Sequence, residues 1–265
     1  MKYLKLAVMS LFMLSQAEAD EGNLRSHDAT YLMTQVHQYG RDWSPVEQAQ
    51  GLLRYKFRRT CDGWTVEHQT ALDMIYENDA RSQMVWHYTS WEAQDGSKLR
   101  FRTRTQTNGM ETENISGEAR HEVGETAVVY SQLSDKRLSL PAGTYFPTSH
   151  MVEALKQAEK GEVLFNGFYF DGSDDNAGFS LDTVMTRFDG KPLAKVEDVK
   201  LDKQPAWDMQ LAFFDSQSQD STPYMEIGAR YRQDGVTTRL MQNFGDFVLQ
   251  GRLIELTYAD EPVCP

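Results

Sequence analysis

The sequence is short of basic residues and contains almost no cysteine. Its 27 Lys and Arg residues stand against 39 Asp and Glu residues, which gives a formal net charge of −12. Because an acidic chain repels phosphate backbones, this balance argues against a protein that binds nucleic acid. The 40% of hydrophobic and 25% of charged residues are typical of a globular protein and exclude an intrinsically disordered chain.

The chain past residue 19 also lacks a long apolar run. A membrane-spanning helix needs about 18 to 20 consecutive apolar residues, so we expect no transmembrane span. Residues 1–19 instead have the pattern of a secretory signal peptide, in which a basic start and an apolar stretch over residues 6–14 precede a small-x-small site ending at Ala19. We expect cleavage after Ala19, which leaves one exported, soluble domain of residues 20–265.

Cys61 and Cys264 are the only two cysteines. In an oxidising compartment two thiols pair, so we predict a disulfide between them. The alternative is a redox-active pair, but such pairs usually lie close together as C-x-x-C. Two cysteines alone also make a poor zinc site.

Strict alternation of apolar and polar residues is the dominant pattern in the chain. The even-numbered residues from Trp64 to Tyr76 face one way and the odd-numbered residues face the other, which predicts a long, half-buried strand. Similar segments follow, separated at short intervals by turn pairs such as Asp95-Gly96 and Asp234-Gly235. This arrangement predicts an antiparallel meander of roughly a dozen or more strands.

One segment has helical spacing instead. We predict a single helix over residues 148–160, with Thr148 or Ser149 as its N-cap and Gly161 at its end. A sheet of this many strands must curl, split into two layers or close. The interior of a curled sheet of more than about eight strands is too wide for its own side chains to fill. We therefore expect the helix to occupy the interior, and any space that it leaves to be an apolar cavity.

Three strings of residues are characteristic of a known family. They lie around Cys61 (Cys61-Asp62-Gly63-Trp64), between Leu140 and His150, and between Gly245 and Leu253. With these strings the chain resembles the cell-envelope integrity EipB family of exported bacterial proteins. The resemblance implies a periplasmic location, a Cys61–Cys264 disulfide and an all-β, spiral-like, partly open β-barrel around one central helix. It also implies a role in envelope integrity and supplies no catalytic residues. The implied fold is similar to that of the periplasmic lipoprotein carriers.

Aromatic side chains are the first candidate site. On the alternating strands they would ordinarily form the core, and the alternative is that some of them line a cavity for an amphiphile. His68 lies on the apolar face of its strand, where we expect a hydrogen-bonded core or cavity-wall residue. The candidate cavity or binding face consists of Trp64, His68, Tyr76, Trp86, Tyr88, Trp207 and Phe213.

A cationic stripe is the second candidate site. Arg100, Arg102 and Arg104 alternate along one strand face and could meet an anionic headgroup or an acidic partner. The ordinary interpretation is a solvated face paired with neighbouring glutamates, or protection of a sheet edge.

Signals for metal, cofactor or catalytic chemistry are weak. The acidic loop from Asp171 to Asn176 lacks the Gly and the Glu of a calcium-binding loop, so we predict a polar turn. There is no G-x-S-x-G elbow, no S-x-x-K set and no Gly-rich phosphate loop. We expect no metal and no cofactor. None of the six histidines has metal-binding spacing: His27, His37, His68, His87, His121 and His150.

The leading hypothesis is a non-enzymatic periplasmic protein that supports envelope integrity by binding an envelope partner. The alternative is a periplasmic carrier or sensor of a lipid, a lipoprotein acyl chain or another amphiphile. A third hypothesis, an envelope hydrolase or an inhibitor of one, has no positive support in the sequence.

Overall fold

The computed structural model describes residues 23–36, 45–131, 136–173, 175, 178–189, 195–196 and 199–264. Within them, fourteen strands form one antiparallel sheet in the spatial order β8-β7-β6-β5-β4-β3-β2-β1-β16-β15-β14-β13-β10-β9, and β11 and β12 form a separate two-stranded hairpin. The elements are β1 (His27–Val36), β2 (Val46–Arg59), β3 (Gly63–Tyr76), β4 (Arg81–Ala93), β5 (Lys98–Thr107), β6 (Met110–Glu122), β7 (Glu125–Tyr130), β8 (Arg137–Pro141), α1 (Pro147–Glu159), β9 (Leu164–Tyr169), β10 (Phe179–Arg187), β11 (Lys195–Val196), β12 (Val199–Lys200), β13 (Ala206–Asp215), β14 (Met225–Arg232), β15 (Thr237–Asn243) and β16 (Val248–Tyr258).

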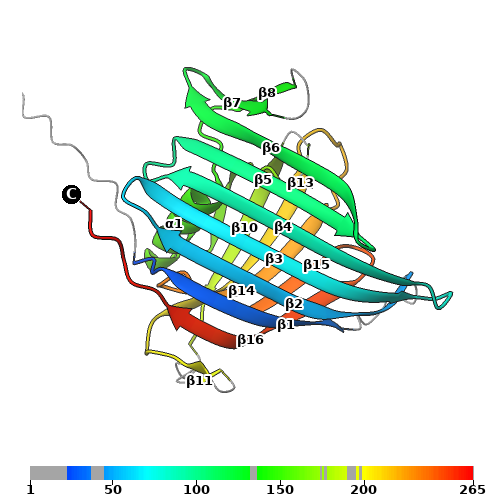
Figure 1. The fold of residues 1–265 in the computed structure, drawn as a ribbon. Helices are drawn as coiled ribbons and strands as arrows, with labels where there is room; N and C mark the ends of the chain where they lie inside the picture. Colours follow the sequence, from blue (N-terminus) through cyan, green and yellow to red (C-terminus); the bar gives the residue numbers. More distant parts are fainter. Residues whose placement is uncertain are drawn as a thin grey trace, which may run out of the picture.

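The sheet curls on itself. Its first and last strands in the sequence, β1 and β16, are neighbours, with a register that runs from His27 opposite Tyr258 to Val36 opposite Val248. In Figure 1, β2 to β6 form the front wall, and β10 and β13 to β15 form the rear wall. The free edges of the sheet are β8 and β9. The expected curled, partly open β-barrel with one helix is confirmed.

A short contact narrows the opening between the two free edges. Tyr145, on the connection from β8 to α1, forms a parallel bridge with Tyr169. Its backbone N–H donates to the carbonyl of Phe168 at 2.7 Å, and its carbonyl accepts from the N–H of Phe170 at 3.0 Å. Among the described residues, this bridge near the end of β9 therefore narrows the gap between the two edges, and no complete ladder closes it.

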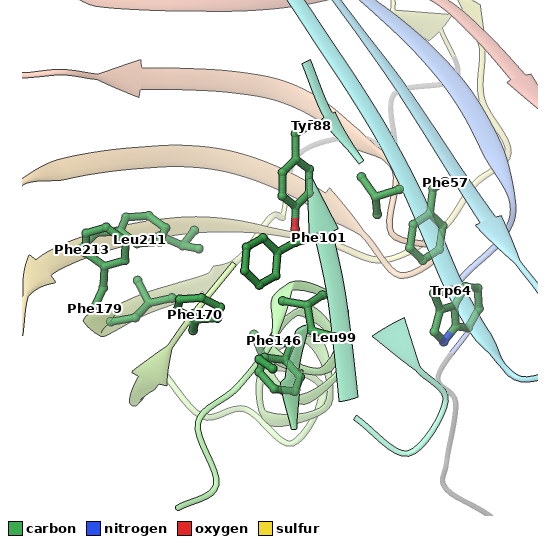
Figure 2. Close-up of a cluster of buried hydrophobic side chains, with 14 of the residues drawn as sticks. Phe57, Trp64, Tyr88, Leu99, Phe101, Phe146, Phe170, Phe179, Leu211 and Phe213 are labelled. Carbon is green, nitrogen blue, oxygen red and sulfur yellow. The ribbon is translucent and has the colours of Figure 1, made fainter. Parts of the chain in front are cut away.

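The alternating pattern places apolar side chains inside. Front-wall residues Phe57, Trp64, Tyr88 and Phe101 meet rear-wall residues such as Phe213 in a buried cluster at the interior of the barrel (Figure 2). A second buried cluster lies among β1, β2, β15 and β16, and it includes Tyr31, Met33, Leu53, Leu249 and Leu253. The predicted inner face of β3 is confirmed, because its even-numbered residues face these clusters.

The helix lies across one mouth of the barrel. Gly96, in the β4–β5 turn, lies directly beside Ser149 near the start of α1, and Gly235, in the β14–β15 turn, lies beside Met151. At the other end of α1, the Gln233 amide donates to the Glu159 carboxylate at 2.7 Å. The helix therefore covers the mouth at which these turns lie, and the opposite mouth is rimmed by the β3–β4, β5–β6 and β15–β16 turns.

The start of the helix differs from the prediction. Neither Thr148 nor Ser149 is the N-cap, because the N-cap position is held by Phe146, which has no capping side chain. The carboxylate of Glu92 on β4 takes that role and accepts the N–H groups of Thr148 and Ser149, each at 2.7 Å. The predicted end is confirmed: Gly161 has a positive φ, and its N–H donates to Ala158 in a Schellman-type closure.

The helix cap makes stability depend on pH. Burial raises the pKa of Glu92 to about 6, although the two backbone N–H groups favour its charged form. A carboxyl with a raised pKa contributes stability that is fully present below its unfolded-state pKa and is lost as pH rises through 6. We expect the free energy of unfolding, relative to Glu92→Gln, to fall by about 2 kcal/mol between pH 4 and pH 7. Denaturant titrations across this range measure the difference.

The control for this experiment is Glu162→Gln, which changes an exposed glutamate just past the helix. Its pH profile should run parallel to that of the unchanged protein. A parallel profile for Glu92→Gln as well would contradict the assignment.

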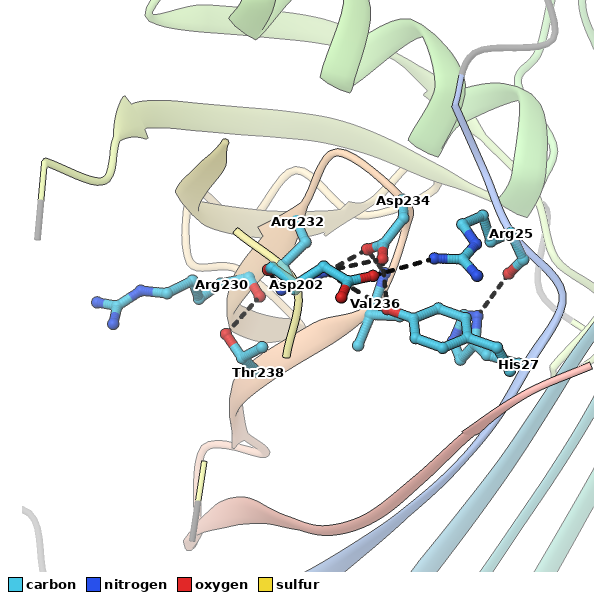
Figure 3. Close-up of polar contacts among 9 residues, drawn as sticks. Arg25, His27, Asp202, Arg230, Arg232, Asp234, Val236 and Thr238 are labelled. Atoms are coloured by element: carbon cyan, nitrogen blue, oxygen red, sulfur yellow. Dashed lines mark hydrogen bonds and ion pairs between the residues drawn. The ribbon is translucent and has the colours of Figure 1, made fainter. Parts of the chain in front are cut away.

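A buried ion pair joins the β14–β15 turn to the ends of β1 and β16 (Figure 3). The guanidinium of Arg232 donates twice to the carboxylate of Asp234, at 3.1 Å each, and both side chains are almost fully buried. The Tyr258 hydroxyl also donates to Asp234, at 2.5 Å. Burial opposes the charged form of Asp234, but the hydrogen bonds from Arg232 and Tyr258 outweigh it and hold its pKa below the usual range.

The predicted disulfide is confirmed. Cys61, in the β2–β3 turn, is bonded to Cys264 in the segment after β16, with a Cα–Cα distance of 5.4 Å and a sequence separation of 203. The bond ties the last residues of the chain to the mouth that the helix covers.

Candidate functional site

Three aromatic side chains on the inner wall of the barrel are not fully buried. Tyr55 on β2, His68 on β3 and Trp86 on β4 all lie on the inner faces of strands that have neighbours on both sides. Each of these side chains is nevertheless only half-buried. Because paired strands flank them, their exposed surface faces the interior, and we call the part of the interior that they face the lumen.

The lumen lies where the two hydrophobic clusters meet. Tyr55 and Ile227 are partly buried, and both pack against both clusters. Tyr231 on β14 is also half-buried and lies near enough to Tyr55 to interact with it electrostatically. Since β14 belongs to the rear wall (Figure 1), Ile227 and Tyr231 form the side of the lumen opposite Tyr55.

The structure divides the predicted aromatic face into two groups. His68, Tyr76 and Trp86 are half-buried, with Tyr76 at the end of β3 beside the uncovered mouth. The other four side chains belong to the filled core, at 5% exposure or less. These core residues are Trp64, Tyr88, Trp207 and Phe213.

The aromatic rings on the front wall form a continuous row of contacts. The His68 ring meets the Tyr55 ring edge-on, with a centroid distance of 6.1 Å, and the Trp86 ring edge-on, at 4.7 Å. Trp86 is stacked on Tyr88 at 5.7 Å. Such contacts restrict the orientation of each ring.

Two titratable side chains of the lumen wall, His68 and Tyr55, are uncharged at neutral pH. Burial lowers the pKa of His68 to about 4, so its imidazole is neutral, and its Nε2 is paired with the Thr70 hydroxyl at 3.0 Å. Burial also raises the pKa of Tyr55 far above its ordinary range. An uncharged aromatic surface of this kind suits an apolar ligand portion with few polar atoms.

The arginine stripe follows its ordinary interpretation at two of three positions. Arg100 pairs with Glu118 at 3.3 Å and lies over the Trp91 ring at 5.2 Å, while Arg104 reaches Glu111 at 4.0 Å. Arg102 lies exposed between them. The stripe is on the outer face of β5, away from the lumen, and carries no further argument for an anionic ligand.

The remaining histidines contact protein groups. His27 bonds to the Arg25 carbonyl at 2.7 Å, His121 to the Thr144 carbonyl at 3.0 Å, and His150 to the Thr183 hydroxyl at 3.3 Å. His87 lies 3.8 Å from the Glu67 carboxylate, and His37 lies outside the described residues. In the part of the chain that the structure describes, no three His, Cys, Asp or Glu side chains come together as metal ligands.

The acidic loop after β9 forms a turn. The Asp171 carboxylate accepts the backbone N–H of Ser173 at 2.8 Å, and its backbone carbonyl accepts the Tyr88 hydroxyl at 2.9 Å. Asp174 and Asn176 lie outside the described residues. The loop therefore holds the side chain of the core residue Tyr88 in place.

A surface pocket of about 390 Å³ lies elsewhere, near the ends of β10 and β14. Its lining includes Arg230 and Arg232. Arg230 is bidentate to Asp208, at 2.8 and 2.9 Å, and Arg232 is bound to Asp234. Because these cations already have partners, the lumen is the stronger candidate site.

Three lumen residues were missed by the sequence reasoning. Tyr55 could have been found, because Leu53, Tyr55 and Phe57 alternate with basic residues in β2. The alternation before the Asp234-Gly235 turn predicts a strand that contains Ile227 and Tyr231, but it does not show which wall they face. Their place opposite Tyr55 follows from the curling of the sheet and has no signal in the sequence.

Comparisons with known proteins agree on one family. A family model described as EipB-like matches residues 18–260. The chain is 31% identical over 228 residues to the cell envelope integrity protein EipB of Brucella abortus (strain 2308), an alignment that spans 82% of this chain and 79% of the relative. Among solved structures, a beta-barrel-like protein of a domain of unknown function from Brucella abortus superimposes with a TM-score of 0.81. That match has 26% sequence identity and covers 90% of this chain and 100% of the other.

Among the residues that the structure describes, none of the helical structure is long and apolar enough to cross a bilayer.

Proposed function

This chain belongs to the EipB-like family, and from that membership we propose that it supports the integrity of the bacterial cell envelope from the periplasm, without catalysing a reaction. The relative from Brucella abortus is named for cell envelope integrity. The Cys61–Cys264 disulfide supports an oxidising compartment. The signal-peptide pattern of residues 1–19, which lie outside the described residues, supports export.

In this proposal the protein holds an amphiphile in the lumen and acts as a carrier or sensor of a lipid or a lipoprotein acyl chain. The observation that carries this is the half-buried inner wall of Tyr55, His68 and Trp86. Apolar surface left in contact with solvent inside a barrel is unfavourable until an apolar group covers it. The helix covers one mouth, so a ligand would enter through the opposite one.

Trp86→Ala is expected to weaken lumen binding. The change removes one ring of the wall, and we expect the Kd for 1-monooleoylglycerol to rise about tenfold or more. Isothermal titration calorimetry measures the Kd, and mass spectrometry of organic extracts identifies what native protein from periplasm carries. The matched control is Trp91→Ala, which removes a tryptophan from the outer face of the same strand. Native protein that is empty and binds no amphiphile would contradict the proposal.

The second candidate is docking of an envelope protein, which is favoured by the outer edge of β9 before its bridge to Tyr145. This strand contains no charged residue, and Val163, Leu164 and Val184 are exposed beside it. An exposed, uncharged edge strand can pair with an extended segment of another chain. An empty barrel, together with an envelope protein that cross-links at Leu164 in cells, would favour this candidate over the first.

A further inference from the structure

Hydroxyl groups inside the barrel are usually bonded to protein. The Tyr31 hydroxyl donates to the carbonyl of Thr237 at 2.8 Å, and the Tyr88 hydroxyl donates to the carbonyl of Asp171 at 2.9 Å. The great majority of buried polar groups in proteins find such a partner. Interior polar groups without one therefore need an explanation.

On the front wall of the lumen, two polar groups have no such partner. Among the described residues, neither the Tyr55 hydroxyl nor the Trp86 indole N–H makes a hydrogen bond. The rings of both residues contact the His68 ring. Neither atom is sealed off from solvent, in contrast to the Trp207 N–H, which is also without a partner but fully enclosed. Both groups are therefore reachable from the lumen.

These two groups define the polar chemistry that the lumen can recognise. Both can donate a hydrogen bond, and the indole N–H can only donate. The wall offers no cation, since His68 is neutral, so an anion placed there would be desolvated without compensation. The matching ligand group is an uncharged acceptor. A carbonyl oxygen, with two lone pairs, fits this requirement.

We propose that the Tyr55 hydroxyl and the Trp86 N–H form a subsite for the carbonyl oxygen of an acyl ester or amide. The lumen then selects acylated amphiphiles over ethers of the same chain length and over free fatty acid anions. This inference rests on the proposed function, because it needs an amphiphile in the lumen. Glycerolipids supply the ester and acylated lipoproteins supply the ester or the amide.

The experiment compares four probes of equal chain length by isothermal titration calorimetry. They are 1-monolauroylglycerol (ester), N-lauroylethanolamine (amide), 1-O-dodecylglycerol (ether) and laurate (anion). We expect the unchanged protein to bind the ester and the amide about tenfold more tightly than the ether or laurate. Tyr55→Phe should weaken ester and amide binding toward that of the ether and leave the ether unchanged. Whichever of the ester and amide probes binds more tightly indicates which acyl linkage the lumen prefers.

Tyr31→Phe is the matched control. Its hydroxyl already donates a hydrogen bond to the Thr237 carbonyl. The change should therefore lower the melting temperature and leave the preference for ester over ether intact. Tyr55→Phe should not lower the melting temperature, because it removes a hydroxyl without a protein partner. Equal binding of ester and ether by the unchanged protein, or an equal loss of preference in both variants, overturns the subsite. Failure of all four probes to bind overturns the proposed function itself.

Discussion

Replacing both Cys61 and Cys264 by serine is expected to lower the free energy of unfolding by up to about 5 kcal/mol. The disulfide closes a loop with a sequence separation of 203, and in the chain-entropy model the stabilisation grows with the logarithm of loop length. Without the bond, the residues after β16 are held by fewer contacts, such as the Ser26 backbone N–H donating to the Glu261 carboxylate at 2.8 Å.

Denaturant titration of the oxidised protein and the double serine variant measures this change. Reductant provides the internal control, because it should lower the stability of the unchanged protein to that of the variant and have no effect on the variant itself. Both cysteines are exposed, so reductant can reach the bond. An unchanged melting temperature on reduction would contradict the expected contribution.

The second large effect is expected from the buried ion pair. Asp234→Leu leaves the Arg232 guanidinium charged and almost fully buried without its carboxylate, and such a change typically costs about 3 to 5 kcal/mol. Arg232 would retain its bond to the carbonyl of Asp202, at 2.7 Å, which satisfies only one of its donors.

A double-mutant cycle separates the pair from its surroundings. Arg232→Met combined with Asp234→Leu should be more stable than Asp234→Leu alone, because no uncompensated charge remains. The exposed pair of Lys56 and Glu67, 3.2 Å apart, serves as the comparison, since exposed ion pairs contribute at most about 1 kcal/mol. Additive losses at Arg232 and Asp234 would contradict the coupling.

Most of the long strands could be predicted from the sequence because they have one buried face. From Trp64 to Tyr76 the alternation is strict, and a one-residue shift would move every apolar side chain out of the core. The helix could be predicted because its spacing breaks that alternation. The pairing of β1 with β16 could not, because it joins segments at opposite ends of the chain and leaves no local pattern.

The candidate site could be predicted only in part, because alternation identifies the inner face and not how fully it is packed. His68 and Leu72 share the inner face of β3, yet His68 is half-buried and Leu72 is buried. The difference depends on what the opposite wall brings to each position. The capping role of Glu92 could not be predicted for a similar reason. A glutamate in a strand is expected to face solvent, and its role becomes visible only once the helix that it caps is placed beside it.

The pairing of the first strand with the last limits the order in which the strands can pair during folding. The meander from β1 to β8 consists of neighbouring hairpins, which need only short loops to close. The β1–β16 ladder must wait until the final strand has emerged, and contacts of such long sequence separation are slow to form. Until the chain is complete, β1 would therefore remain an unpaired edge on one side.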